Sequence, residues 1–226
     1  MSSNEGNRKA LILVGGSWHN FEGFVASFRA LFPDWTVEAS YDLDVLLSLD
    51  SSSTGAGSSV DLVVGDTCFA RYNDGREETG PFAMSNEQIE ALGEWVRGGG
   101  AYLPYHSGTV LGDSSPEFGK LNGGVFTGHP PAYSFSVYPM FGDHPIREGV
   151  SVFSVYDEFY MERLVDHVDV HLVGIDRGVA YPLAWSKKEG RGRVAHVALG
   201  HSEHVWNHPM YQKLMRNTVA WLLGDV

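Results

Sequence analysis

The sequence predicts an α/β protein built around an open, mostly parallel sheet. Apolar runs typical of buried strands alternate with helical patterns in the first half of the chain, and the connections are short. Several strand-like runs separated by turns follow in the second half, which predicts a mixed sheet with antiparallel pairing there. The 226 residues are 43% hydrophobic and 19% charged. This length and composition fit one domain, residues 1–226, with a sizeable core.

Four strands are expected in the first half of the chain. Residues 9–14 and 61–65 are continuous apolar runs, and residues 35–39 form a shorter one. The fourth, residues 101–105, comes directly after a run of three glycines. Continuous apolar runs of this length are typical of strands that are covered on both faces of a sheet.

Two helices connect these strands. Residues 21–32 carry apolar side chains at helical spacing. Residues 86–97 follow Ser85, and Gln88 is placed to complete a capping box before the glycine run ends the helix. Residues 48–59 are rich in serine and glycine and are expected to form a surface loop. The resulting order is β-α-β-β-α-β.

The second half has a different pattern. Residues 126–131 read as a loop, and residues 133–138 read as an edge strand. Three consecutive strands, separated by turns, are then expected at residues 168–174, 182–186 and 193–199. The glycines around residue 191 predict a hairpin-like connection between the last two. Residues 209–223 close the chain as an amphipathic helix.

Composition and charge exclude several classes of function. The net charge of −12 opposes nucleic-acid binding, which requires basic surface. No apolar run is long enough to span a membrane, and the polar first residues lack the apolar core of a secretory signal. We therefore expect a cytoplasmic protein. The single cysteine, Cys68, excludes an internal disulfide and a thiolate-rich zinc site.

Three of the ten histidines follow expected strands. His106 comes after the fourth strand, His201 after the last strand, and His19 after the first. Side chains beyond the carboxyl ends of strands in an α/β sheet line the crevice in which ligands bind. These histidines can be metal ligands, general acids or bases, or polar residues satisfied within loops. If they converge, they can hold a divalent metal, zinc or similar, with an open position for water or substrate.

Glu158 is a further candidate. It lies in the block Asp157-Glu158-Phe159-Tyr160, in which Glu158 and Tyr160 face one way if the chain is extended. A carboxylate near the histidines can transfer a proton or complete a metal shell. The alternative is a salt-bridged carboxylate on an edge strand.

The remaining histidines have simpler interpretations. His204 and His208 are expected at the surface or at a helix cap, because His208 precedes a proline at the start of the last helix. His144 lies in a turn. His129 lies in a proline-rich loop that can overhang the crevice.

Several blocks, in this order, resemble the ThuA-like family, which is named for trehalose utilisation. The blocks are Gly98-Gly99-Gly100 with His106, Asp143-His144-Pro145-Ile146, Asp157-Glu158-Phe159-Tyr160, Tyr181-Pro182-Leu183-Ala184-Trp185, Gly192-Arg193-Val194, and Ala198-Leu199-Gly200-His201 with Val205-Trp206. The resemblance covers nearly the whole chain. It implies the class I glutamine amidotransferase-like fold, a flavodoxin-like three-layer sandwich with an altered second half.

The resemblance also assigns His106 and His201 to positions that have known roles in amidotransferases. Amidotransferases of this group hold a nucleophilic cysteine in a Gly-x-Cys-x-Gly turn, and the matching stretch here places His106 in that position. His201 occupies the position of their catalytic histidine. Without a thiol at the turn, glutamine amidotransferase activity is not expected. Ser107 is one position away from the turn and is an alternative nucleophile, with His201 as its base.

Three functions are therefore compatible with the sequence. The first, which the resemblance favours, is an isomerase or lyase acting on a small-molecule sugar, such as trehalose, a related disaccharide or a keto-sugar. His106, His201 and Glu158 would be catalytic, and His19, His106 and His201 would bind the metal. The second is a non-catalytic sugar-binding or regulatory protein. The third is a hydrolase that uses Ser107. The sequence leaves a homo-oligomer open.

Overall fold

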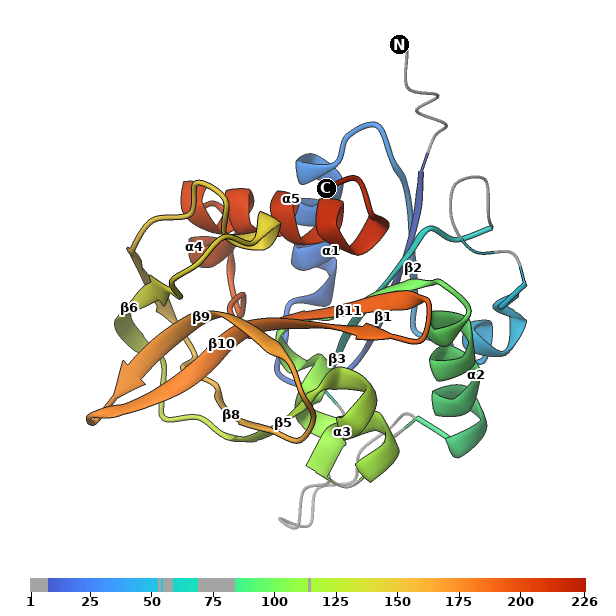
Figure 1. Ribbon diagram of the computed structural model, residues 1–226, viewed down its shortest axis with the longest axis horizontal. Helices are drawn as coiled ribbons and strands as arrows, with labels where there is room; N and C mark the ends of the chain where they lie inside the picture. The colour runs from blue at the N-terminus through green and yellow to red at the C-terminus, as the bar shows by residue number, and fades with distance from the viewer. Residues whose placement is uncertain (1–7, 53, 55–58, 69–83, 114) are drawn as a thin grey trace.

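A computed structural model describes residues 8–52, 54, 59–68, 84–113 and 115–226. It confirms the predicted α/β fold, a three-layer sandwich with a central sheet and helices on both faces (Figure 1). Within residues 48–59, residues 53 and 55–58 lie outside this description.

The central sheet has nine strands in the order β2-β1-β3-β4-β11-β10-β9-β6-β7. Their bounds are β1 Lys9–Gly16, β2 Thr36–Ser40, β3 Leu62–Cys68, β4 Ala101–Pro104, β6 Tyr133–Pro139, β7 Phe153–Asp157, β9 Asp169–Asp176, β10 Val179–Glu189 and β11 Gly192–Val197. Strands β2, β1, β3, β4 and β11 run parallel to one another. From β11 through β10, β9, β6 and β7 every pairing is antiparallel. The sheet is therefore mixed in the way the sequence predicts.

Helices cover both faces of this sheet. Their bounds are α1 Phe21–Leu31, η1 Leu43–Ser48, α2 Asn86–Arg97, η2 His106–Asp113, α3 Pro116–Asn122, η3 Pro145–Arg147, α4 Glu203–Trp206 and α5 Pro209–Leu223. Helices α1, α4 and α5 pack on one face, and η1, α2 and α3 pack on the other (Figure 1). No helix in the described part of the chain is long and apolar enough to cross a membrane.

Alternation along β1 shows why the core has two parts. Ile12 and Val14 join the apolar cluster beneath α1 and α5, whereas Leu11 and Leu13 join the cluster beneath α2. A strand turns successive side chains to opposite faces, so a strand covered on both sides must be apolar throughout. This is the physical basis of the continuous apolar runs in the first half.

The helix boundaries follow from local chemistry. The side chains of Ser85 and Gln88 form the predicted capping box at α2. His208 caps α5, because its Nδ1 accepts from the backbone N–H of Met210, and Pro209 is the first helical residue. His144 caps the short η3 in the same way. The capping interpretation of His208 and the turn interpretation of His144 are thus confirmed.

Two expectations for the second half are wrong. Residues 126–131 were expected to form a loop. Residues 129–131 do so, but residues 126–128 belong to β5 (Gly124–Gly128), which pairs with β8 (Met161–Leu164) in a small second sheet. Residues 133–138 were expected at an edge, but β6 lies between β9 and β7, and β7 is the edge. Alternating apolar residues identify a half-buried strand, yet they contain no information about which neighbour returns beside it.

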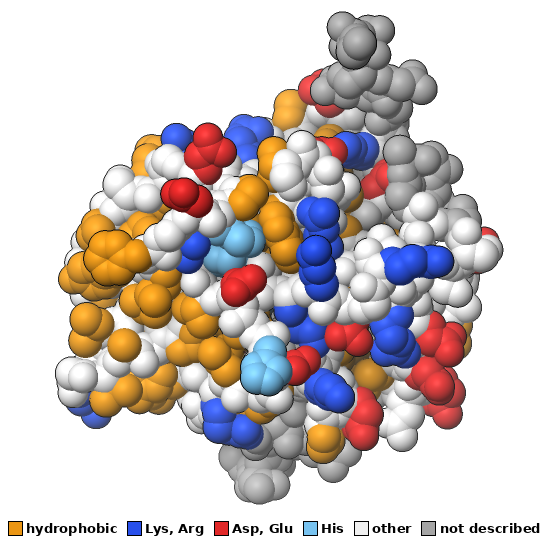
Figure 2. Space-filling view, viewed as in Figure 1, with side chains coloured by type: hydrophobic (Ala, Val, Ile, Leu, Met, Phe, Trp, Pro, Cys, Tyr) orange, Lys and Arg blue, Asp and Glu red, His pale blue; other side chains and the backbone are white. Residues whose placement is uncertain are grey.

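The antiparallel half exposes apolar side chains that no helix covers. They gather over β6, β9 and β10 on the face shown in Figure 2. Exposed examples are Tyr138, Met140, Phe141, Ile175 and Val179. The outer face of this half of the sheet is consequently open to solvent.

Candidate functional site

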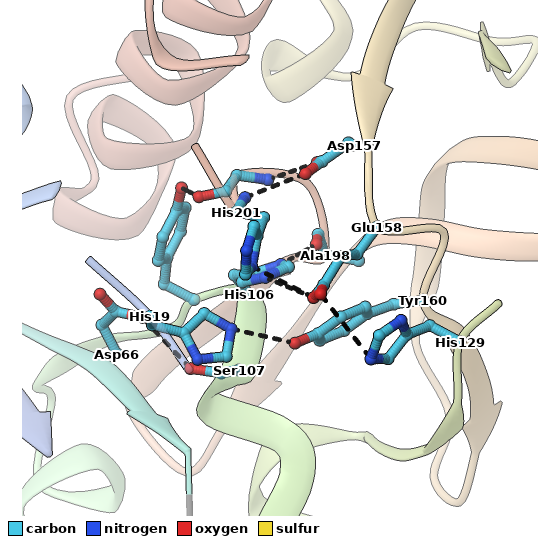
Figure 3. A network of polar contacts seen from close by, with 12 residues as sticks. His19, Asp66, His106, Ser107, His129, Asp157, Glu158, Tyr160, Ala198 and His201 are labelled. Carbon is cyan, nitrogen blue, oxygen red and sulfur yellow. Dashed lines mark hydrogen bonds and ion pairs between the residues drawn. The ribbon is translucent and has the colours of Figure 1, made fainter. Parts of the chain in front are cut away.

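The three histidines that follow strands meet in the structure, and Glu158 joins them (Figure 3). One ligand atom from each of His19, His106, Glu158 and His201 lies within 4.8 Å of all the others. The sequence placed the histidines at strand ends but could not show that they converge. The structure brings all four together beyond the carboxyl ends of the parallel strands.

The parallel strands deliver the histidines. His19 lies in the turn between β1 and α1, His106 begins η2 directly beyond β4, and His201 follows β11. Glu158 comes from the other half of the molecule, because it lies in the short connection between β7 and β8. The site therefore forms where the parallel and antiparallel halves of the sheet meet.

A tight turn presents His106. Its φ is +40°, a conformation that non-glycine residues rarely adopt. Two residues later the chain passes so close to β3 that a Cβ at Gly108 would collide with the carbonyl oxygen of Gly65. The strained residue and the required glycine are features of the strand-to-helix elbow that presents a nucleophile in related folds. Here the elbow presents an imidazole.

Backbone carbonyls orient two of the rings. Nδ1 of the fully buried His106 donates to the carbonyl oxygen of Ala198 at 2.6 Å. Nδ1 of His19 donates to the carbonyl oxygen of Ser17 at 2.9 Å. With the proton held on Nδ1, Nε2 of each ring carries no hydrogen and can accept, and Nε2 of His106 has no hydrogen-bond partner among the described residues.

Asp157 fixes the turn that carries His201. Its buried carboxylate accepts from the backbone N–H of Gly200 at 2.7 Å and of His201 at 3.1 Å. Sequence reasoning missed this role, although Asp157 precedes Glu158 in the block that carries the resemblance. One short segment thus supplies both a site carboxylate and the anchor for a site histidine.

The contacts around Glu158 have the dimensions of a metal shell. Its Oε2 lies 3.6 Å from Nε2 of His106 and 3.2 Å from Nδ1 of His201. Within the described part of the chain, all three atoms are buried and have no hydrogen-bond partner. Ligands bound tetrahedrally at zinc distances of about 2.0–2.1 Å lie about 3.3–3.4 Å apart. The separations fit ligands that share one ion.

The electrostatics favour the ligand forms of Glu158 and His19, but not that of His106. Burial would raise the pKa of Glu158, but His106 and His201 hold it well below its usual range. Burial, together with His106, lowers the pKa of His19 to about 3. Burial lowers the pKa of His106, but Glu158 and Asp157 outweigh it and raise that pKa above its ordinary value. At neutral pH the site therefore holds an anionic carboxylate and a neutral His19, which are the forms that bind metals.

The cluster opens into a pocket of about 530 Å³. Its wall consists of Trp18, His19, Cys68, Val110, Phe126, Gly128, His129, Glu158, Tyr160 and His201. A mostly apolar and aromatic wall with a few convergent polar groups is typical of small-molecule sites. Aromatic faces of this kind also suit the apolar face of a sugar ring.

Tyr160 and His129 connect the cluster to the pocket. The Tyr160 hydroxyl donates to Nε2 of His19 at 3.3 Å, and its ring stacks on that of His106 with centroids 4.1 Å apart. Nε2 of His129 lies 3.8 Å from Oε1 of Glu158 (Figure 3). Tyr160 faces the pocket together with Glu158, and His129 overhangs it, as the sequence predicts.

Other candidates lie elsewhere. Ser107 is fully buried, and its hydroxyl donates to Asp66 at 3.3 Å rather than to His201. This arrangement gives no support to the hydrolase hypothesis. His204 is exposed on α4, which agrees with its surface interpretation.

The family described as ThuA, trehalose utilisation, matches residues 72–222. The chain belongs to the ThuA family. A search of curated proteins finds no match.

Solved structures confirm the fold. A ThuA-like protein from Parabacteroides merdae has a TM-score of 0.75 at 17% identity and covers 97% of this chain and 91% of its own. A β-galactosidase from Rahnella sp. R3 has a TM-score of 0.65 at 14% identity, covering 96% of this chain but 31% of its own. A GMP synthase protein from Thermoplasma acidophilum has a TM-score of 0.58 at 14% identity and covers 98% of this chain and 97% of its own. At these identities the likeness concerns the fold alone.

Proposed function

We propose that this ThuA-family protein is a metal-dependent enzyme of carbohydrate metabolism. Its substrate would be trehalose, a related disaccharide or a keto derivative of one, and its reaction an isomerisation or an elimination that moves a proton next to a carbonyl. The observation that carries the proposal is the convergence of three imidazoles and one carboxylate at the base of an open pocket, in which the facing atoms of His106, His201 and Glu158 have no hydrogen-bond partner among the described residues.

The donor set fits a divalent cation. Imidazole nitrogens and a carboxylate oxygen suit zinc, iron, nickel or similar ions. His106 would bind through Nε2, His201 through Nδ1 and Glu158 through Oε2, the atoms that face one another. His19 would bind through Nε2, because its Nδ1 is held by the carbonyl oxygen of Ser17. When bound, such an ion would supply Lewis-acid polarisation of a substrate oxygen.

The protein's own groups can then move protons around that oxygen. Oε1 of Glu158 faces His129, and both residues line the pocket. Glu158 and His129 can therefore remove a proton from the substrate carbon next to the carbonyl and return one to it. Burial raises the pKa of Tyr160 well above its ordinary value, which keeps its hydroxyl protonated as a donor. His106, in the nucleophile position of the amidotransferase elbow, replaces covalent acyl chemistry with ligand chemistry.

The family supports the carbohydrate assignment, and the pocket is compatible with it. The ThuA description names trehalose utilisation. A volume of about 530 Å³ lies in the usual range for small-molecule sites and can hold a sugar unit against Trp18, Phe126 or Tyr160.

Metal content and zinc affinity of the purified protein test the metal half of the proposal. The wild type should bind about one ion per chain, and His201→Ala should lose about 100-fold or more in affinity. His204→Ala is a matched control, because it removes an exposed histidine from the same segment and should bind as the wild type does. Absence of stoichiometric binding by the wild type would refute the metal site.

Turnover tests the other half. Keto derivatives of trehalose or of a related disaccharide should be converted by the metal-loaded protein, with exchange of a carbon-bound hydrogen for deuterium in D₂O, and Glu158→Gln should abolish that exchange. Sugar binding with no exchange and no conversion would instead establish the non-catalytic binding alternative.

A further inference from the structure

A second polar cluster lies buried near the first, and the mechanism does not use it. The Thr109 hydroxyl donates to Oε1 of Glu162 at 2.8 Å. The same oxygen lies 3.5 Å from Nε2 of His196, and both of these side chains are completely enclosed. We call Thr109, Glu162 and His196 the buried triad.

Each member of the buried triad lies close in sequence to one ligand of the proposed metal site. Thr109 lies on η2, three residues after His106. Glu162 lies on β8, four residues after Glu158.

The third member of the buried triad, His196, also lies close in sequence to a proposed ligand. His196 lies on β11, five residues before His201. One set of side-chain contacts therefore connects the three chain segments that carry three of the four proposed ligands.

The contacts continue into the backbone around the elbow. Nδ1 of His196 donates to the carbonyl oxygen of Pro104 at 2.8 Å, two residues before His106. The Asn122 side chain donates to the carbonyl oxygen of Gly108 at 3.3 Å, two residues after it. The elbow is thus held by polar contacts on both sides and by Thr109 beyond it.

Burying these groups is costly. Oε2 of Glu162 and Nε2 of His196 have no hydrogen-bond partner within the described residues. A buried, incompletely paired carboxylate lowers stability relative to an apolar replacement, so its contribution has to be sought elsewhere. The best-attested contribution of buried polar groups is to fix one register among alternatives.

We infer that the buried triad sets the positions of the metal ligands. Thr109, Glu162 and His196 are positioning residues that hold η2, β8 and β11 in the one mutual register that brings His106, Glu158 and His201 within a single coordination shell. This inference rests on the metal site proposed above. It assigns a role to three residues that touch neither the pocket nor the proposed ligand atoms.

Zinc affinity, measured by competition with a chelator, tests the inference without requiring activity. Thr109→Val removes the hydroxyl donor with little change in volume, and Glu162→Gln removes the charge while keeping an oxygen acceptor. Each should weaken zinc binding about tenfold or more, as loss of outer-shell support usually does. Because both act through one contact, the double variant should lose less than the product of the two single effects.

Two controls separate positioning from general stability. Thr218→Val removes another buried threonine hydroxyl, one with no hydrogen-bond partner among the described residues, on α5, and should leave zinc affinity unchanged. Thr109→Ser retains the hydroxyl and should restore affinity to within about twofold of the wild type. If Thr109→Val does not fold, Thr109→Ala compared with Thr109→Ser measures the same hydroxyl.

The outcomes are distinguishable. A wild type that binds no metal refutes the metal site and the inference with it. A wild type that binds zinc, with Thr109→Val and Glu162→Gln binding equally tightly, overturns the inference alone, whatever happens to the melting temperatures. Weaker binding by both variants, with Thr218→Val unchanged, supports it.

Discussion

Two groups of histidines pack in this protein, and their neighbours distinguish a candidate site from structural packing. In the site group, ring nitrogens of His106 and His201 face one carboxylate at the base of an open pocket. In the second group, the rings of His144 and His171 lie tilted against each other with centroids 4.2 Å apart, and Nε2 of His171 contacts the Ser186 hydroxyl at 2.7 Å.

Charge makes the difference. Burial is the main cause of the lowered pKa values of both His144 and His171, and Arg147 lowers both further, so the charge beside the second group disfavours a cation. Glu158 beside the first group attracts one. Histidine proximity alone therefore does not identify a metal site, because the sign of the charge shared by the rings decides what they can hold.

The largest expected effect separates the two groups by metal affinity. His106→Asn should reduce zinc affinity more than about 100-fold, because it removes a ligand at the elbow, whereas His171→Gln should change it less than about twofold. Isothermal titration of both variants with zinc measures this. Equal losses in the two would show that the comparison is wrong and that binding depends on general integrity.

A smaller effect should come from the anchor beneath His201. Asp157→Asn keeps one acceptor oxygen but turns an NH₂ group toward a backbone N–H, which loses its partner. The free energy of unfolding should fall by about 1–3 kcal/mol. Urea denaturation measures the loss, and Asp143→Asn, on an exposed loop, serves as the control. A stability equal to that of the wild type would contradict the anchoring role.

The second group of histidines should make the stability of the protein depend on pH. Burial, then His144 and Arg147, lower the pKa of His171 to about 3, whereas an unfolded chain binds the proton near 6.5. Between these values the unfolded state carries more protons, so stability is complete above about pH 6.5 and falls as the pH decreases.

His171→Gln should lower the free energy of unfolding at pH 7.5, because it removes the contact of His171 with Ser186. It should also make the decline of that free energy from pH 6.5 to pH 4.5 shallower, by up to about 1.4 kcal/mol per pH unit. Urea denaturation across that pH range provides the slopes. His19, whose pKa is also lowered to about 3, should keep part of the slope in the variant. His167→Gln, at an exposed site, is the control, and an identical slope in His171→Gln and the wild type would count against this interpretation.

The smallest effect belongs to a histidine outside both groups. His208→Ala removes the N-cap of α5 and should cost about 0.5–1 kcal/mol of stability without affecting zinc affinity. Thermal unfolding with zinc titration of the same sample checks both parts. A change in zinc affinity would mean that α5 contributes to the site.

The two halves of the sheet also differ in how far sequence alone predicts them. Apolar runs and strand ends were sufficient to place His19, His106 and His201 on the same side of the sheet, because the carboxyl ends of parallel strands all lie on that side. The position of Glu158 required the order of β6, β7 and β9, which depends on long-range pairing that no local pattern encodes. The roles of Asp157 and of the buried triad could not be predicted from the sequence for the same reason, since each of their contacts joins segments more than 30 residues apart.

The elbow at residue 106 separates the architecture of this fold from its chemistry. Its backbone path is fixed by the positive φ and by the close approach of Gly108 to Gly65, neither of which depends on the side chain that residue 106 carries. A change at this one position can therefore exchange a nucleophile for a ligand while the scaffold stays intact. On such a scaffold function can change by replacement of this one side chain, so a shared fold indicates where a site lies more securely than what the site does.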